Sequence, residues 1–223
     1  RLAAVLRKFN KNSANDEADL LSLRKRLVET KLGFAYDEIL NLLRVELAVS
    51  SALAKLMNAV SLGKRKACIT EIIVEGITAT EVADGLEALM LESSPSHDMV
   101  NLSACPDHYV LRPLGKNRLE VIETTGGSPF PIQFFIDYGD EAGLTIPRDS
   151  SYPCQSVGVA RLRDGTTIGG VRHQLRDQGN GFRARLAVEF PVMAPAYFIR
   201  QHQFHLACEF SHWFQWLLAH KSQ

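Results

Sequence analysis

The sequence lacks the charge imbalance and the long apolar segments that indicate nucleic-acid or membrane proteins. Its 223 residues carry 25 basic and 25 acidic side chains, so the formal net charge is zero. A balanced charge argues against the basic footprint that a nucleic-acid partner requires. No apolar run reaches the roughly 18 residues needed to span a bilayer. Residues 1–13 contain too short an apolar stretch and too many basic side chains for a signal peptide. We therefore expect a cytoplasmic protein without a membrane span.

Cysteine is also scarce, and its spacing excludes two common uses. The chain has four cysteines, and no two of them form a CxxC pair. Zinc-ribbon and thioredoxin-type sites both need that pair. We expect reduced, buried thiols, as is usual in the cytoplasm. The four are Cys68, Cys105, Cys154 and Cys208.

Proline is absent from the first 94 residues, and the first 90 contain no histidine. Three stretches there carry apolar residues at helical spacing. The third opens with Thr78 and Glu81, which fit a capping box. We predict a helical region over residues 1–92 that holds no catalytic or metal centre and that covers a cavity or forms a homodimer. The three stretches are residues 16–30, 36–62 and 78–91.

After a turn-rich connection over residues 91–107, the hydrophobic period changes to two, which is typical of strands. The last segment, from Ala194-Pro195 onward, is a long helix rich in aromatic residues. We predict an α+β unit over residues 105–223, in which a curved antiparallel sheet grips the final helix above a ligand cavity. The strand candidates are residues 109–114, 118–124, 131–140, 155–162, 167–176 and 181–190.

The final helix carries an unusual polar face. At about 100° per residue, His202, His205, Glu209 and His212 fall within roughly 80° of one another. His205 and Glu209 are four residues apart, so both side chains can reach a single ion at about 2.0–2.2 Å. The alternative is an ordinary His–Glu hydrogen bond on an amphipathic helix. Buried groups of this kind need a partner or a metal.

Three segments of the chain resemble the phloretin hydrolase and diacetylphloroglucinol hydrolase family, which is part of the START-related helix-grip superfamily. HLACEFSHW in the final helix is similar to the HxxxE helix that donates two metal ligands in this family. VRHQLRDQGNGFRARLAVEF looks like the long hairpin before that helix. VIETTGGSPFPIQFFIDY resembles the strand in which a Glu shortly before a Gly-Gly pair is a ligand. The resemblance covers about residues 105–220.

The resemblance implies a helix-grip, START-like fold, a zinc ion, and hydrolysis of the carbon–carbon bond between an acyl group and a phenolic ring. It also implies Glu123, His205 and Glu209 as metal ligands. Family members have a further His ligand upstream, within a longer segment than this chain provides. His108, fifteen residues before Glu123, is the leading candidate for that fourth ligand. Without it, three protein ligands and a water still form a workable catalytic zinc site.

Other residues are candidates for the chemistry and for substrate binding. Strand alternation turns His173 toward the predicted cavity, where it would bind substrate, act as an acid–base group, or be a hydrogen-bonded core histidine. His202 and His212 are the further catalytic candidates. A planar phenolic or polyketide-like substrate would contact Phe134, Trp213 and Trp216.

Two functions therefore stay open at this stage. The first is a metal-dependent hydrolase acting on a hydrophobic aromatic acyl substrate through metal-activated water. The second is a metal-free START-like protein that binds, transports or cyclises an apolar ligand, with His205 and Glu209 forming only a polar patch. A third interpretation makes the N-terminal helices a partner-docking module.

Overall fold

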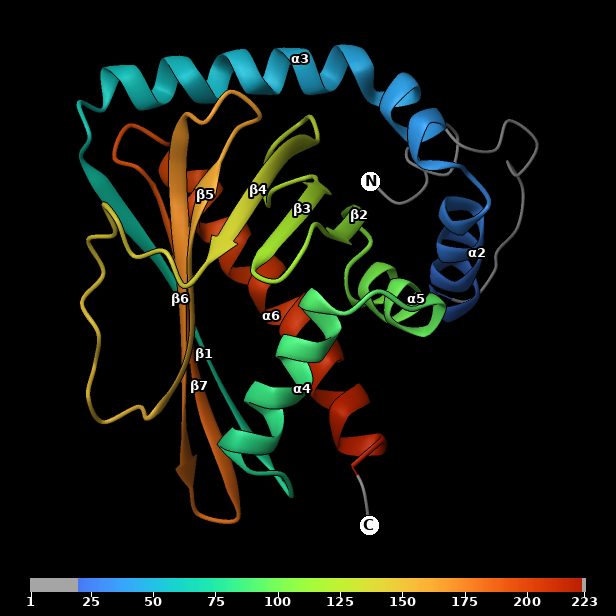
Figure 1. The fold of residues 1–223 in the computed structure, drawn as a ribbon, viewed down its shortest axis with the longest axis vertical. Helices are drawn as coiled ribbons and strands as arrows, with labels where there is room; N and C mark the ends of the chain where they lie inside the picture. The colour runs from blue at the N-terminus through green and yellow to red at the C-terminus, as the bar shows by residue number, and fades with distance from the viewer. Residues whose placement is uncertain (1–19, 222–223) are drawn as a thin grey trace.

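The computed structural model describes residues 20–221 and shows an α+β fold in which one antiparallel sheet wraps around a long C-terminal helix (Figure 1). The sheet has seven strands in the order β1-β7-β6-β5-β4-β3-β2, and every neighbouring pair is antiparallel. The strands are β1 (Arg65–Glu75), β2 (His108–Pro113), β3 (Arg118–Glu123), β4 (Ile132–Tyr138), β5 (Cys154–Arg161), β6 (Thr167–Gln178) and β7 (Gly181–Pro191).

The helices lie on one face and at one end of this sheet. In Figure 1, α6 runs across the sheet, α4 and α5 lie beside α6, and α3 crosses the strand ends at the top. The helices are α2 (Leu20–Leu32), α3 (Tyr36–Val60), α4 (Ala79–Leu91), α5 (Pro95–Ala104) and α6 (Ala196–Ala219). No helix in the described part of the chain is both long enough and apolar enough to cross a membrane.

The main hydrophobic core fills the space between α6 and the sheet. Leu206, Phe210 and Phe214 recur at helical spacing on α6, so they share one face, and all three are buried. They pack against alternate residues of the central strands, such as Leu175 and Leu186. The helix is therefore gripped by the sheet, and the predicted helix-grip fold class is confirmed.

Most element boundaries also agree with the sequence pattern. The six predicted strands and the final helix are present within two residues at most of the expected ends. Thr78 and Glu81 form the predicted capping box, in which the Thr78 hydroxyl accepts a hydrogen bond from the Glu81 backbone N–H. All four cysteines are free thiols. The predictions for residues 1–19 lie outside the described residues.

The description of residues 1–92 as helical is wrong for one segment. Residues 65–75 form β1, which pairs along its whole length with β7 at the edge of the sheet. Five of the six residues from Ile69 to Val74 are β-branched, and such residues favour strands. The sheet therefore crosses the predicted boundary between residues 92 and 105.

The turn-rich connection over residues 91–107 also contains an element that was not predicted. Residues 95–104 form α5, which begins with Pro95 in its first turn. The Ser94 hydroxyl accepts a hydrogen bond from the His97 backbone N–H at 3.1 Å and so caps the helix. The Ser-Pro pair that was interpreted as a turn is a helix start.

Candidate metal centre and ligand cavity

Two of the predicted ligands come from one turn of α6. His205 and Glu209 are both buried, with exposed fractions of 5% and 7%. Their four-residue spacing puts them on the same face, and His205 Nε2 lies 3.5 Å from Glu209 Oε2. The apolar neighbours of this face hold it against the sheet, so neither side chain is solvated.

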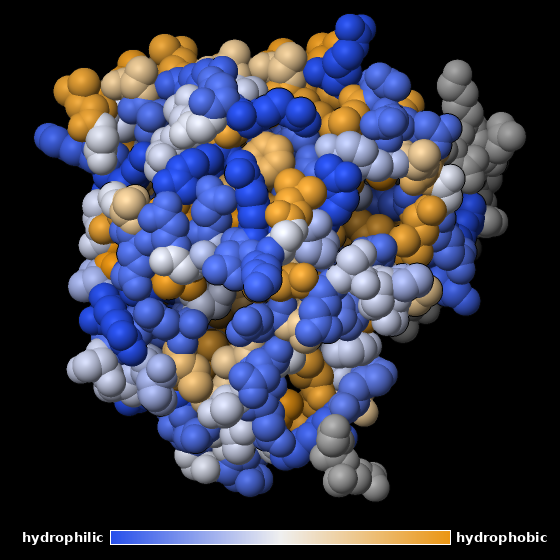
Figure 2. Space-filling view, in the orientation of Figure 1, coloured by the Kyte–Doolittle hydropathy of each residue, from blue (hydrophilic) through white to orange (hydrophobic). Residues whose placement is uncertain are grey.

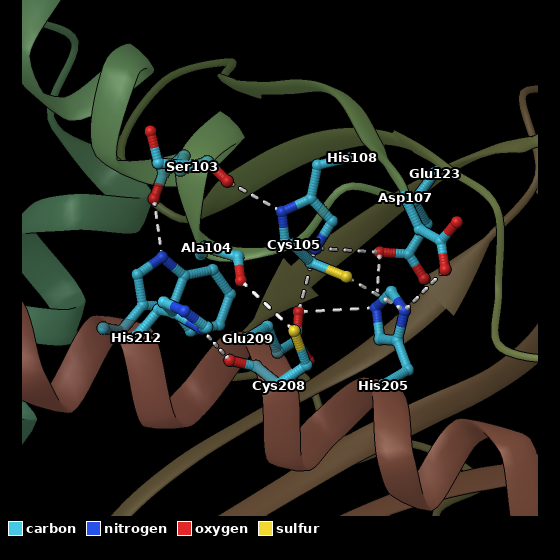
Figure 3. A network of polar contacts seen from close by, with 12 residues as sticks. Ser103, Ala104, Cys105, Asp107, His108, Glu123, His205, Cys208, Glu209 and His212 are labelled. Carbon is cyan, nitrogen blue, oxygen red and sulfur yellow. Dashed lines mark hydrogen bonds and ion pairs between the residues drawn. The ribbon is translucent and has the colours of Figure 1, made fainter. Parts of the chain in front are cut away.

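The β2–β3 hairpin supplies the other two predicted ligands. The strand register places His108 directly opposite Glu123, and both side chains are buried. His108 Nε2 lies 3.0 Å from Glu209 Oε2 and 3.8 Å from Glu123 Oε2. His205 Nε2 lies 3.6 Å from Glu123 Oε2. The structure thus brings His108, Glu123, His205 and Glu209 together, and we call these residues the four-donor cluster (Figure 3).

Two glycines in the connection between β3 and β4 allow the chain after Glu123 to approach α6. A Cβ on Gly126 would lie 2.6 Å from the backbone oxygen of Gln201, which is closer than real side chains come. Gly127 has a φ of 84°, a left-handed conformation that side chains disfavour. The Gly-Gly pair after Glu123 therefore lets the chain pass against the helix that carries the other donors.

The spacing of the four-donor cluster fits a single small ion. Ligand atoms about 2.0–2.2 Å from a tetrahedral zinc lie roughly 3.3–3.6 Å from one another. The four histidine–carboxylate distances in the cluster run from 3.0 to 3.8 Å, and all four ligand atoms lie within 4.8 Å of one another. His205 Nε2 is also buried without a hydrogen-bond partner among the described residues. Two imidazoles and two carboxylates are a common zinc donor set, so the cluster can hold a metal ion.

Neighbouring groups orient both histidines of the cluster. His108 Nδ1 lies 2.7 Å from the Asn101 carbonyl oxygen, which accepts a hydrogen bond when Nδ1 is protonated and leaves Nε2 facing the carboxylates. Asn101 is itself fixed, because its side-chain oxygen accepts from Trp213 Nε1 at 3.1 Å. His205 Nδ1 lies 3.7 Å from Cys105 Sγ and 3.8 Å from Asp107 Oδ2. Figure 3 shows the His205 ring with Cys105 and Asp107 beside it as well as Glu123 and Glu209.

Electrostatics couple the histidines to the carboxylates. Burial alone would lower the pKa of His205, but the carboxylates of Glu123 and Glu209 raise it well above its ordinary value. Burial alone would raise the pKa of Glu209, but the charge on His205 and the hydrogen bond from His108 hold it well below its usual range. Without a metal, the cluster therefore carries a proton on His205, and a bound metal would have to displace that proton.

A cavity of about 570 Å³ lies between the sheet, α3, α4 and α6, and the four-donor cluster is at its wall. Glu123 and Glu209 both line it. Two of the three predicted substrate contacts, Phe134 and Trp213, line it as well. The rest of the lining is mainly apolar, which suits a hydrophobic ligand with a few polar groups.

Two predicted catalytic histidines face this cavity. His173 on β6 and His202 on α6 both line it and are buried. Burial lowers the pKa of His173 to about 4. Burial, with the nearby charge of His205, lowers the pKa of His202 to about 4. Both imidazoles are neutral at pH 7, and among the described residues their buried Nδ1 atoms have no hydrogen-bond partner.

The structure places two other predicted site residues elsewhere. His212 lies outside the cavity, where its Nε2 contacts Arg24 at 2.9 Å and its Nδ1 contacts the Cys208 backbone oxygen. Trp216 stacks on His220 near the end of α6 and does not line the cavity. A helical wheel shows angles and ignores the rise of about 1.5 Å per residue. Residues 212 and 216 are therefore about 10 and 16 Å further along the axis than His205.

Sequence reasoning missed three residues that surround the cluster. Cys105, Asp107 and Asn101 were all assigned to the turn-rich connection. Cys105 forms a second buried group with His108 and His205, in which all ligand atoms lie within 4.8 Å of one another. The Ser94-Pro95 pair is the sequence signal that could have predicted α5. This helix carries Asn101, whose backbone oxygen contacts His108.

Comparisons with known proteins give no functional assignment. No protein-family model matches the chain, and no curated protein matches its sequence. The crystal structure of Ara h 8.0201 is 8% identical, with a TM-score of 0.46 over 70% of this chain and 99% of that chain. A conserved protein from Geobacillus kaustophilus is 13% identical, with a TM-score of 0.38 over 70% and 94%. Protein Ms6760 from Mycobacterium smegmatis is 14% identical, with a TM-score of 0.34 over 70% and 91%.

These likenesses are too distant to support an argument about this chain. The helix-grip description follows from its own sheet order and from the position of α6. The phloretin hydrolase family is not among the matches, since no family model and no curated protein matches the chain. The structure thus supports the resemblance for the helix-grip fold only.

Proposed function

We propose that this protein is a metal-dependent hydrolase whose substrate binds in the cavity beside the four-donor cluster. The observation that carries the proposal is the cluster of two histidines and two carboxylates, all buried, whose carboxylates Glu123 and Glu209 line a largely apolar cavity. Zinc in such a site lowers the pKa of a bound water toward about 7 and polarises a carbonyl oxygen. His108, Glu123, His205 and Glu209 would hold the ion.

The proposed substrate is a phenolic or polyketide-like aromatic ketone, as the family resemblance implies. Trp213 and Phe134 offer flat apolar surfaces to an aromatic ring. In the proposed reaction, water adds across the acyl–aryl carbon–carbon bond. The acyl carbon takes the hydroxyl and becomes a carboxylic acid, and the ring carbon takes the proton.

His173 and His202 have the properties needed to handle that proton. Both are neutral at pH 7, and each lines the cavity with a buried Nδ1 atom that has no hydrogen-bond partner in the described part of the chain. Such an imidazole can accept a hydrogen bond from a phenolic hydroxyl, or take a proton and return it to the ring carbon. His173 is held edge-on against Phe210, with ring centroids 4.8 Å apart, so its ring orientation is fixed by packing.

The test is hydrolysis of acylated phloroglucinols by zinc-loaded protein, with both products quantified by chromatography. We expect equal amounts of carboxylic acid and deacylated phenol. His205→Ala should abolish turnover together with zinc binding. His173→Ala should lower turnover while leaving zinc bound, because His173 is not part of the cluster. Zinc-loaded protein that binds these ketones but never cleaves them would refute the hydrolase proposal.

A metal-free carrier of apolar ligands is the second candidate. Its support is the 3.0 Å hydrogen-bond contact between His108 Nε2 and Glu209 Oε2, which gives both buried side chains a partner without an ion. A carrier should bind an environment-sensitive apolar dye equally well in excess chelator and in zinc. A hydrolase should bind a phenolic ketone more weakly once the metal is removed.

A further inference from the structure

The outward face of α3 carries a continuous apolar stripe. Six large side chains on this face are 40–64% exposed. They follow one another at spacings of 3, 4, 4, 3 and 4 residues, which keeps them within about 80° on a helical wheel. We call them the α3 stripe, and Figure 2 shows apolar side chains along the top of the molecule, over this helix. They are Leu42, Val45, Val49, Leu53, Leu56 and Val60.

The stripe is not needed to hold α3 on its own protein. A different face, about 100° around the helix from the centre of the stripe, does this through buried residues: Ile39 and Leu43 join a core cluster with Tyr109 and Ile122. Further along, the Ser50 hydroxyl donates a hydrogen bond to the Pro131 carbonyl at 2.7 Å. The exposed residues are therefore available for another surface.

The form of the stripe favours another helix as its partner. Steps of three and four residues are typical of a helix–helix seam, in which side chains interlock along the whole length. From residue 42 to residue 60 the stripe is about 27 Å long, and a width of about 10 Å gives an apolar area near 300 Å². The largest apolar patch on a soluble monomer typically covers about 300–600 Å² and is often functional.

Charges at the two ends of α3 indicate which helix that is. Asp37 and Glu38 are exposed in the first turn, and Lys64 is exposed just after the last turn. If two copies pair in antiparallel orientation, the acidic end of each α3 lies next to the basic end of the other. The numbers of two residues that face each other across the two copies then add up to about 102, so that Leu42 of one copy faces Val60 of the other.

We infer that the α3 stripe binds the same stripe of a second copy of this chain, antiparallel and about a two-fold axis near residue 51. Such an interface is self-complementary, as two-fold symmetry requires. A membrane surface fits the helix less well, because α3 carries Arg44 and Lys55 together with acidic side chains and so lacks the uniformly basic polar face of an interfacial helix.

The pairing would also bear on the cavity. Ser50, Leu53 and Met57 of α3 line the cavity, and Leu53 is half exposed as a member of the stripe. The second copy would thus cover Leu53 and hold in place the helix that roofs the cavity. This inference does not depend on the proposed hydrolase activity.

The first test measures the mass of the full chain in solution. Sedimentation velocity from about 5 to 200 µM should show a monomer–dimer equilibrium with a dissociation constant in the micromolar range, as expected for a small interface. Val49→Glu should weaken dimerisation at least tenfold, since it puts two carboxylates near the axis. Met99→Glu, at a 54% exposed apolar residue of α5, is the matched control and should leave the dimer intact. Circular dichroism establishes that both variants fold.

The second test fixes the orientation by cross-linking. Ala52→Cys lies near the proposed axis, so two copies should be joined by a short bis-maleimide. Leu42→Cys should not be joined, because residue 42 meets residue 60 in the antiparallel dimer. A parallel dimer would join both variants and overturn the inference.

Other outcomes would assign the stripe to a different occupant. A chain that stays monomeric at 200 µM would overturn the inference, and so would a dimer that Val49→Glu leaves unchanged. Binding of the monomer to neutral lipid vesicles, lost in Val49→Glu, would assign the stripe to a membrane surface. A monomer that dimerises only after removal of residues 1–19 would assign it to that segment.

Discussion

Replacing Glu209 by Gln should separate a metal centre from a simple polar patch. The change preserves the size of the side chain and removes its charge. Glu209 is 7% exposed, and its Oε2 lies 3.0 Å from His108 Nε2 and 3.5 Å from His205 Nε2. If a metal binds here, Glu209→Gln weakens one of four donors.

The expected loss of affinity follows from the number of ligands. Four-ligand zinc sites in proteins provide about 10–16 kcal/mol, or about 2.5–4 kcal/mol per ligand if the contributions are equal. The amide oxygen of Gln is still a weak donor, so we expect a loss of about 3 kcal/mol. That corresponds to a zinc dissociation constant roughly 100-fold higher.

Glu120→Gln is the matched control. Glu120 is fully buried on the same strand as Glu123, but its carboxylate binds Tyr36 and Arg112 and is not part of the four-donor cluster. Competition with a fluorescent zinc chelator gives the affinities, and thermal denaturation gives the stabilities. Glu120→Gln should lose stability and keep its zinc affinity. If both variants bind zinc within about threefold of the parent chain, Glu209 is not a ligand and the reasoning is refuted.

Three further predictions concern the surroundings of the site. His212→Ala should change zinc affinity less than about twofold in the same competition assay, because that side chain lies outside the four-donor cluster. Gly126→Ala should weaken zinc binding and cost about 1–3 kcal/mol in urea denaturation, since its Cβ would lie 2.6 Å from the Gln201 oxygen. Gly33→Ala, with no contact closer than 3.4 Å, should show neither effect. Burial lowers the pKa of Lys31 from 10.5 to about 8, so the unfolded chain binds more protons between these values. Stability should therefore rise with pH across that window, by about 3 kcal/mol. The same denaturation in Lys31→Met should show no such rise, and an equal rise in both proteins would contradict the burial argument.

Most of the fold could be predicted from the sequence, because the spacing of apolar residues shows which face of each helix or strand packs on the core. The alternation over β2 to β7 and the apolar spacing of α6 predicted a sheet gripping a helix. β1 was missed because residues 65–75 were grouped with the helices before them. A sheet edge formed by strands far apart in sequence has no local signal beyond β-propensity.

The candidate site was only partly readable from the residues themselves. The i, i+4 spacing alone pointed to His205 and Glu209, whereas Glu123 and His108 entered through the family resemblance. The hairpin register is the sequence feature that could have predicted Glu123 and His108 as neighbours. The turn around residues 114–117 places His108 opposite Glu123. The register also carries an irregularity between residues 108 and 110, which the sequence pattern does not reveal.

The position of His212 could not be read from the helical wheel, which ignores distance along the axis. His202 and His212 flank His205 on opposite sides. His202 is one turn away and stacks on the His205 ring at 5.1 Å, while His212 is two turns away and contacts Arg24. His202 and His212 therefore have different surroundings, although both lie close to His205 in angle on the helical wheel.

Metal content tests the central claim most directly. The full chain, purified without an affinity tag or chelator, is analysed by inductively coupled plasma mass spectrometry, before and after dialysis against micromolar zinc. We predict one zinc per chain in the parent protein, and less than about 0.1 in His205→Ala. A parent chain that holds no metal even after dialysis against zinc would contradict the account and leave the carrier of apolar ligands as the better description.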